Sequence, residues 1–145
     1  MTEDLDLKVC IMLPSCVPAT DLDESGAILT DKDIKLLYDE DRIFGLAEMM
    51  NVYGITRGNK DCIEKCVDRN NCGKETDSHA PSLSGDLFNG YLTANISIGH
   101  ECDDLNEAIE KLKRGEWIEI REGSFVKISK HLWGCLKISI IRDVF

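Results

Sequence analysis

Side chains that can bind a metal ion or transfer protons follow five predicted strands, at the points where those strands end. These residues are Ser15, Glu48, His79, His100, Glu101, Arg121, Glu122 and Ser124. The first of the strands, residues 8–13 (KVCIML), is a short apolar run typical of a buried parallel strand. Because the carboxyl ends of parallel strands lie at one edge of a sheet, we expect these side chains to share one rim.

Glu48, His79 and His100 form a suitable ligand set for a first-row divalent metal ion. Neutral imidazole nitrogens bind such ions at about 2.0–2.1 Å, and a glutamate between two cations can offer one oxygen to each. A metal ion held in this way lowers the pKa of its bound water and makes hydroxide available near neutral pH. Glu101 is a carboxylate that can move protons between that water and a leaving group.

Each of these residues also has an ordinary structural interpretation. A single histidine after a strand is more often a loop or capping residue than a ligand. Glu48 can pair with a basic side chain, and residues 77–81 (DSHAP) can form a simple turn. His131 lies in the C-terminal stretch, and we interpret it as structural. From the residues alone, the metal site and these structural roles stay open alternatives.

Strand and helix patterns alternate along the chain. We expect strands at residues 8–13, 43–48, 75–77, 96–99 and 117–121, and helices at residues 30–38, 59–70, 85–95 and 104–114. This order predicts an α/β fold with parallel strands and helical crossovers. The C-terminal residues 125–145 are harder to interpret, because residues 136–141 (LKISII) suit either a strand or an apolar end with no place to pack.

Length and composition exclude several classes of protein. The chain has 145 residues, which is enough for one domain but fewer than the about 250 of a complete β/α barrel. The net charge of −10 argues against nucleic acid as a partner. No stretch approaches the roughly 20 apolar residues of a membrane span. The acidic residues 1–6 (MTEDLD) do not resemble a signal peptide, so we expect a cytoplasmic protein.

The seven cysteines favour thiols over a disulfide framework, because their number is odd and we expect a reducing compartment. Cys62 and Cys66 stand four residues apart and share one face if this segment is helical. A zinc module built from Cys62, Cys66 and Cys72 stays an alternative, although the sequence contains no pair of C-x-x-C knuckles.

Several runs, in the right order and spacing, resemble the adenine deaminases, which are metal-dependent hydrolases of the amidohydrolase superfamily. These runs are residues 12–20 (MLPSCVPAT), 45–51 (GLAEMMN), 77–81 (DSHAP) and 120–124 (IREGS), with His100 and Glu101 between the last two. Ser78 stands where the family usually has glycine. The resemblance covers about residues 7–124, so we divide the chain into a partial barrel at 1–124 and a divergent tail at 125–145.

The resemblance implies hydrolysis of free adenine to hypoxanthine and ammonia, a reaction of purine salvage and adenine catabolism, at a two-metal centre of manganese or iron. It implies that Glu48 bridges the metal ions, that His79 and His100 hold the second one, and that acidic groups such as Glu101 handle protons. The residues in a position to shape the adenine pocket are Ser15, Arg121, Glu122 and Ser124. The implied fold is a partial (β/α) TIM-like barrel of the amidohydrolase type, with about five βα units.

Two parts of the family's metal centre have no match here. The family's first strand carries a His-x-His pair, but none of the three histidines of this chain stand two apart. The family's last strand supplies an aspartate, and Asp143 has no matching surroundings. We therefore expect either a truncated or split enzyme, completed by a complementary chain or by self-association, or a non-catalytic remnant. We also expect an open partial barrel to be marginally stable or to associate.

A related amidohydrolase with another cyclic substrate is a further alternative. Residues 14–20 and 45–51 argue against it, because these runs resemble the adenine deaminases rather than the whole superfamily.

Overall fold

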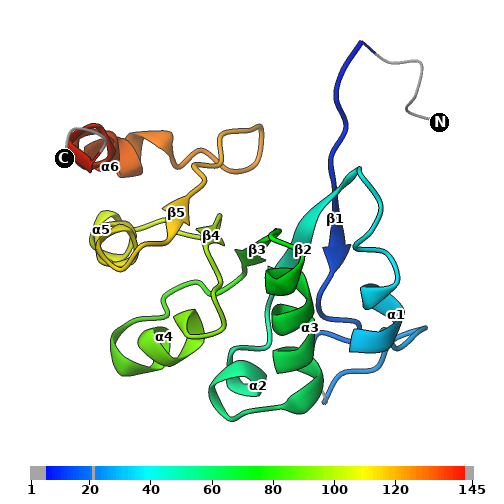
Figure 1. The fold of residues 1–145 in the computed structure, drawn as a ribbon. Helices are drawn as coiled ribbons and strands as arrows, with labels where there is room; N and C mark the ends of the chain where they lie inside the picture. The colour runs from blue at the N-terminus through cyan, green and yellow to red at the C-terminus, as the bar shows by residue number, and fades with distance from the viewer. Residues whose placement is uncertain (1–5, 21, 143–145) are drawn as a thin grey trace.

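The computed structural model describes residues 6–20 and 22–142 of the chain. Five parallel strands form one sheet in the order β1-β2-β3-β4-β5, with helices between them (Figure 1). The strands are β1 (Ile11–Pro14), β2 (Ile43–Met49), β3 (Glu75–Ser78), β4 (Ile98–Gly99) and β5 (Trp117–Ile118). This arrangement confirms the predicted α/β class with parallel strands and helical crossovers. The first five residues of the predicted acidic N-terminus lie outside the described residues.

Three strands are shorter than predicted, because the hydrogen bonds between two strands continue only as far as both strands do. β1 begins at Ile11, which pairs with Ile43 at the start of β2, rather than at residue 8. β4 begins at Ile98 rather than at residue 96. β5 ends at Ile118 rather than at residue 121: Glu119 still donates to the Gly99 carbonyl at 2.8 Å, but β4 stops there.

The helices are α1 (Asp31–Lys35), α2 (Val52–Thr56), α3 (Lys60–Asn71), α4 (Gly85–Leu92), α5 (Leu105–Lys113) and α6 (Ser129–Arg142). The sequence patterns did not predict α2, which is one short turn whose cap residue Asn51 accepts a hydrogen bond from the Gly54 N–H at 2.7 Å. A capping box begins α1, because Asp33 accepts bonds from both the N–H and the hydroxyl of Thr30.

The C-terminal segment is a helix, so the strand interpretation of residues 136–141 is wrong. Ile128, Leu132 and Cys135 recur at helical spacing and form a small core with Ala108 and Leu112 of α5. A strand at the end of the chain would need an edge to pair with, whereas an apolar helix face needs only a neighbouring helix.

A larger core lies between the sheet and the helices that cover it. Leu46, Met49, Phe88 and Tyr91 are fully buried there. The apolar spacing of residues 85–95 predicts that Leu87, Tyr91 and Leu92 face inward, but Leu87 is 40% exposed. Phe88 takes the inward position three residues before Tyr91.

Cys62 and Cys66 share the buried face of α3, as the sequence predicts. All seven cysteines, each within the described part of the chain, are thiols. Among the described residues, no helix is both long and apolar enough to cross a membrane.

Candidate metal centre

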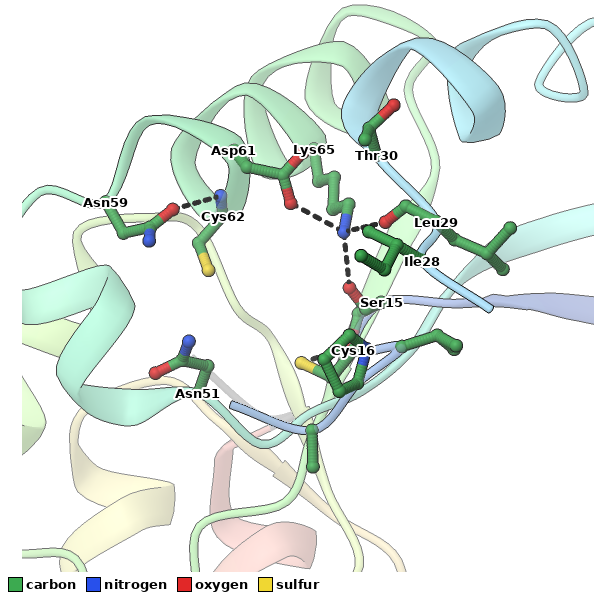
Figure 2. Close-up of a pocket in the computed structure, with 13 residues that line it drawn as sticks. Ser15, Cys16, Ile28, Leu29, Thr30, Asn51, Asn59, Asp61, Cys62 and Lys65 are labelled. Atoms are coloured by element: carbon green, nitrogen blue, oxygen red, sulfur yellow. Dashed lines mark hydrogen bonds and ion pairs between the residues drawn. The ribbon is translucent and has the colours of Figure 1, made fainter. Parts of the chain in front are cut away.

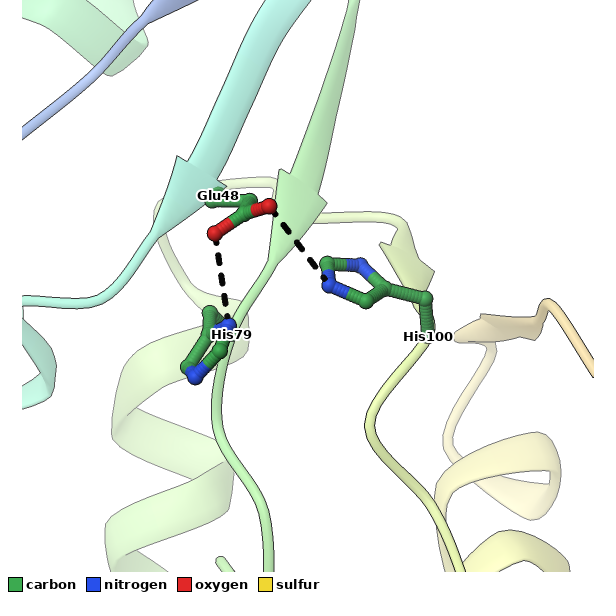
Figure 3. Close-up of side chains that lie close together, drawn as sticks. All are labelled: Glu48, His79 and His100. Atoms are coloured by element: carbon green, nitrogen blue, oxygen red, sulfur yellow. Dashed lines mark ion pairs between the residues drawn. The ribbon is translucent and has the colours of Figure 1, made fainter. Parts of the chain in front are cut away.

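The side chains of Glu48, His79 and His100 meet at the carboxyl ends of β2, β3 and β4 (Figure 3). One ligand atom from each lies within 4.8 Å of the others. Glu48 Oε2 is 3.4 Å from His79 Nδ1, and Glu48 Oε1 is 3.9 Å from His100 Nε2. The three candidate ligands, which the sequence separates by up to 52 positions, therefore face one small space.

His79 Nδ1 is buried and has no hydrogen-bond partner among the described residues. The two imidazole rings stand edge to face, with centroids 5.7 Å apart. A buried ring nitrogen left without a partner beside a carboxylate is uncommon in folded proteins. Two imidazoles and a carboxylate are also the donor set that first-row divalent ions prefer, so the residues present fit such an ion.

Asp77, at the end of β3, contacts the far side of the His100 ring. Its Oδ1 lies 2.9 Å from His100 Nδ1. The hydrogen-bond network assigns the proton to Nδ1 and leaves Nε2 facing Glu48. Burial raises the pKa of the Asp77 carboxyl, and the contact with His100 opposes this effect.

Glu101 adds a second carboxylate to the same space. Its Oε1 is 3.3 Å from His100 Nε2 and 3.9 Å from His79 Nδ1. The Arg121 guanidinium donates to both of its oxygens, at 2.7 and 3.0 Å. A two-pronged contact of this kind fixes the plane of a carboxylate. Glu101, the predicted proton carrier, is therefore paired with Arg121, one of the predicted pocket residues.

The other three predicted pocket residues lie in different surroundings. Ser15 is buried, and its hydroxyl donates to the backbone carbonyl of Glu48 at 2.8 Å. Glu122 accepts a bond from the Ser129 N–H at the start of α6, and Ser124 is exposed on the same loop. Ser15 thus contacts the backbone of a candidate ligand, while Glu122 and Ser124 occupy the loop after β5.

Ser78, the residue that departs from the family pattern, faces away from the metal centre. Side chains alternate along a strand, so Ser78 points opposite to Asp77. Its hydroxyl donates to the buried Glu116 Oε1 at 2.7 Å. Burial raises the pKa of the Glu116 carboxyl, while the bond from Ser78 and the charge of Lys111 lower it. The Ser78 hydroxyl therefore satisfies a buried carboxyl group between the sheet and the helices and does not contact the metal centre.

A cavity of about 250 Å³ lies beside the loop that follows β1 (Figure 2). The buried Lys65 of α3 borders it and donates to the carbonyls of Ser15 and Leu29, at 2.9 and 2.7 Å, while pairing with Asp61 at 2.7 Å. Lys65 thereby joins both ends of this long loop. Sequence reasoning missed Lys65, whose only signal was the Asp61–Lys65 spacing of four residues in a helix.

The Glu–His–His cluster lies at the carboxyl ends of a parallel sheet with helical crossovers, which is where metal-dependent enzymes of parallel-barrel folds place their active sites. The chain is 43% identical to the adenine deaminase of Clostridium acetobutylicum over 126 residues and 40% identical to that of Bacillus subtilis over 121 residues. It is 35% identical to the adenine deaminase of Bacillus licheniformis over 139 residues. No protein-family model matches the chain.

These matches confirm the resemblance to adenine deaminases. They cover 87%, 83% and 96% of this chain, respectively. They cover only 22%, 21% and 24% of the relatives. The chain therefore corresponds to a segment of an adenine deaminase and spans about a fifth of the length of the curated relatives that it matches.

Proposed function

We propose that this segment carries part of the metal centre of an adenine deaminase, which hydrolyses adenine to hypoxanthine and ammonia in the cytoplasm. The observation that supports the proposal is the convergence of Glu48, His79 and His100 on one space, in a chain similar to adenine deaminases. The parallel sheet suits five consecutive βα units of a TIM-like amidohydrolase barrel.

In this proposal, Glu48, His79 and His100 would hold a divalent ion, with His79 Nδ1 and His100 Nε2 as the imidazole donors that face Glu48. Such an ion, most simply Mn²⁺ or Fe²⁺, would supply Lewis acidity that lowers the pKa of a water molecule, so that hydroxide would be available for C6 of the purine near neutral pH. Asp77 holds the His100 ring with Nε2 turned toward this position.

Glu101 is the group that we assign to proton transfer. Its carboxylate reaches both imidazole nitrogens that face the metal position. We propose that it accepts a proton from the attacking water and delivers one to the departing amino group. Arg121 keeps both oxygens of this carboxylate oriented. The remaining pocket residues, Ser15, Glu122 and Ser124, shape the walls around the adenine.

The sequence contains neither the His-x-His pair of the family's first strand nor a match to the aspartate of its last strand. We therefore propose that another polypeptide segment completes the centre. The source is the remainder of a longer protein, a complementary chain or a second copy. Removing the ligands of one cation weakens the binding of both, so we expect the 145-residue chain to be inactive by itself.

A chimera tests this proposal. Residues 7–124 of this chain would replace the matching segment of the C. acetobutylicum adenine deaminase, which supplies the missing ligands. We expect the Mn²⁺-loaded chimera to convert adenine to hypoxanthine and the same chimera with Glu48→Gln to lose that activity. A folded, metal-loaded chimera without activity, or one whose activity survives Glu48→Gln, would contradict the proposal. The first of these outcomes would favour a non-catalytic remnant.

A further inference from the structure

Asp77 contacts two of the three residues in the cluster. Its Oδ1 lies 2.9 Å from the Nδ1 of His100, and the backbone N–H of Glu48 faces its carboxylate closely enough to lower the pKa of this carboxyl. Its side chain is only 17% exposed. We propose that Asp77 is a positioning residue that sets Glu48 and His100 for one shared metal ion. This inference rests on the proposed function for the identity of the site.

The backbone of Glu48 needs such support, because its φ angle is 36°. This left-handed conformation is rare for a residue with a long side chain and persists only where the surroundings enforce it. The Asp77 carboxylate faces the N–H of this residue, and the Ser15 hydroxyl donates a hydrogen bond to its carbonyl at 2.8 Å. Ser15, directly after β1, therefore holds the carbonyl of Glu48, and Asp77 of β3 lies against its N–H, on the two sides of β2.

The His100 ring is held by the same carboxylate. A neutral imidazole carries one proton, and an aspartate acceptor at Nδ1 selects the tautomer with that proton on Nδ1. Nε2 then presents its lone pair toward Glu101 and Glu48, whose nearest oxygens lie 3.3 and 3.9 Å away. The contact of Nδ1 with Asp77 is shorter than either and is the only one at hydrogen-bond distance in this geometry. With the opposite tautomer, the Nδ1 lone pair would face a carboxylate oxygen at 2.9 Å without an intervening proton. Asp77 therefore determines which nitrogen of His100 is available to a metal.

The first test needs no metal. The chain has three histidines, so long-range ¹⁵N–¹H correlation spectra can be assigned with one His→Gln variant for each. At a pH about two units above the usual histidine pKa of about 6.5, we expect His100 to carry its proton on Nδ1 in the metal-free protein. We expect Asp77→Asn to remove this preference. The matched control is Glu75→Gln, which changes a carboxylate two residues earlier in β3 that contacts Ser97 instead.

The second test is Mn²⁺ affinity, measured by electron paramagnetic resonance titration of the 145-residue protein. We expect Asp77→Asn to weaken binding about 10- to 100-fold and Glu75→Gln to leave it unchanged. An unchanged affinity in Asp77→Asn would overturn the inference, and so would a wild-type His100 protonated on Nε2. If neither the chain nor the chimera binds Mn²⁺, the proposed function fails, and the tautomer measurement still decides the role of Asp77. The wild-type spectrum also decides it if Asp77→Asn does not fold.

Discussion

Arg121 binds both oxygens of Glu101, through one nitrogen at 2.7 Å and another at 3.0 Å. Glu101 Oε1, which accepts the shorter bond, is also 3.3 Å from His100 Nε2. The guanidinium therefore fixes a carboxylate at the edge of the proposed metal centre, in a contact that a point charge such as lysine cannot reproduce.

Arg121→Ala should lower the turnover of the active chimera about 100-fold, because general acid–base catalysis contributes at least that factor and a mobile Glu101 loses it. Arg121→Lys should retain only part of the effect, since it offers no planar pair of donors. Steady-state kinetics measure both variants. The matched control is Arg57→Ala, which removes an arginine that lies over the exposed Tyr53 ring. Equal rates for Arg121→Ala and Arg57→Ala would argue against this role.

Ser78→Gly should lower the free energy of unfolding by about 1–3 kcal/mol, because it leaves a buried Glu116 oxygen without its donor. The matched control is Ser82→Gly, at an exposed position whose φ is 59°, where glycine fits without strain. We expect the control to be neutral or slightly stabilising. Urea unfolding measures both variants, and an Mn²⁺ affinity changed by Ser78→Gly would contradict the placement of this residue away from the metal.

Glu116 should make stability depend on pH. Burial raises the pKa of its carboxyl above the ordinary 4.5, so the folded protein holds this proton more tightly than the unfolded chain does. The stabilisation is therefore fully present below about pH 4.5 and decreases as the pH rises toward the folded-state pKa. Glu116→Gln should remove this decrease. Parallel slopes of unfolding free energy against pH in the two proteins would contradict the assignment.

Thiol reactivity should divide the cysteines by burial. Burial raises the pKa of the Cys66 and Cys102 thiols to about 12. At pH 8, only about one in 10⁴ of each of these thiols is therefore ionised to the reactive thiolate. Cys10 and Cys72 are exposed, so a reagent in solution can reach their thiols directly. Alkylation with iodoacetamide, followed by mass spectrometry, should modify Cys10 and Cys72 well before Cys66 and Cys102. Rapid modification of Cys66 in the folded protein would contradict its burial.

The elements predicted best from sequence have a strong local signal. Helix α5 follows from its apolar spacing and from two pairs of opposite charge four residues apart. Both pairs, Glu107–Lys111 and Glu110–Arg114, form ion pairs at 3.0 and 2.7 Å. The sequence could not indicate that Lys111 is buried, since that depends on the carbonyl of Ala80, which binds it at 2.8 Å from outside the helix. Helix α2 has too few residues to show a period.

The candidate metal site was predicted only in part, because some of its geometry depends on contacts between separate strands. Glu48, His79 and His100 could be named because parallel strands deliver their carboxyl ends to one edge. The left-handed backbone of Glu48 and its two supporting contacts depend on neighbouring strands, which no local pattern encodes. Asp77 was visible only as part of a motif, two residues before His79, and its contact with His100 needed the fold.

The central claim is that Glu48, His79 and His100 together hold a divalent metal ion. The most direct test is Mn²⁺ binding by the 145-residue chain, compared with Glu48→Gln, His79→Gln and His100→Gln and with the control His131→Gln, which changes an exposed histidine of α6. We predict that each of the three site variants weakens binding at least tenfold and that His131→Gln binds as the wild type does. Equal affinities in all five proteins would contradict the claim.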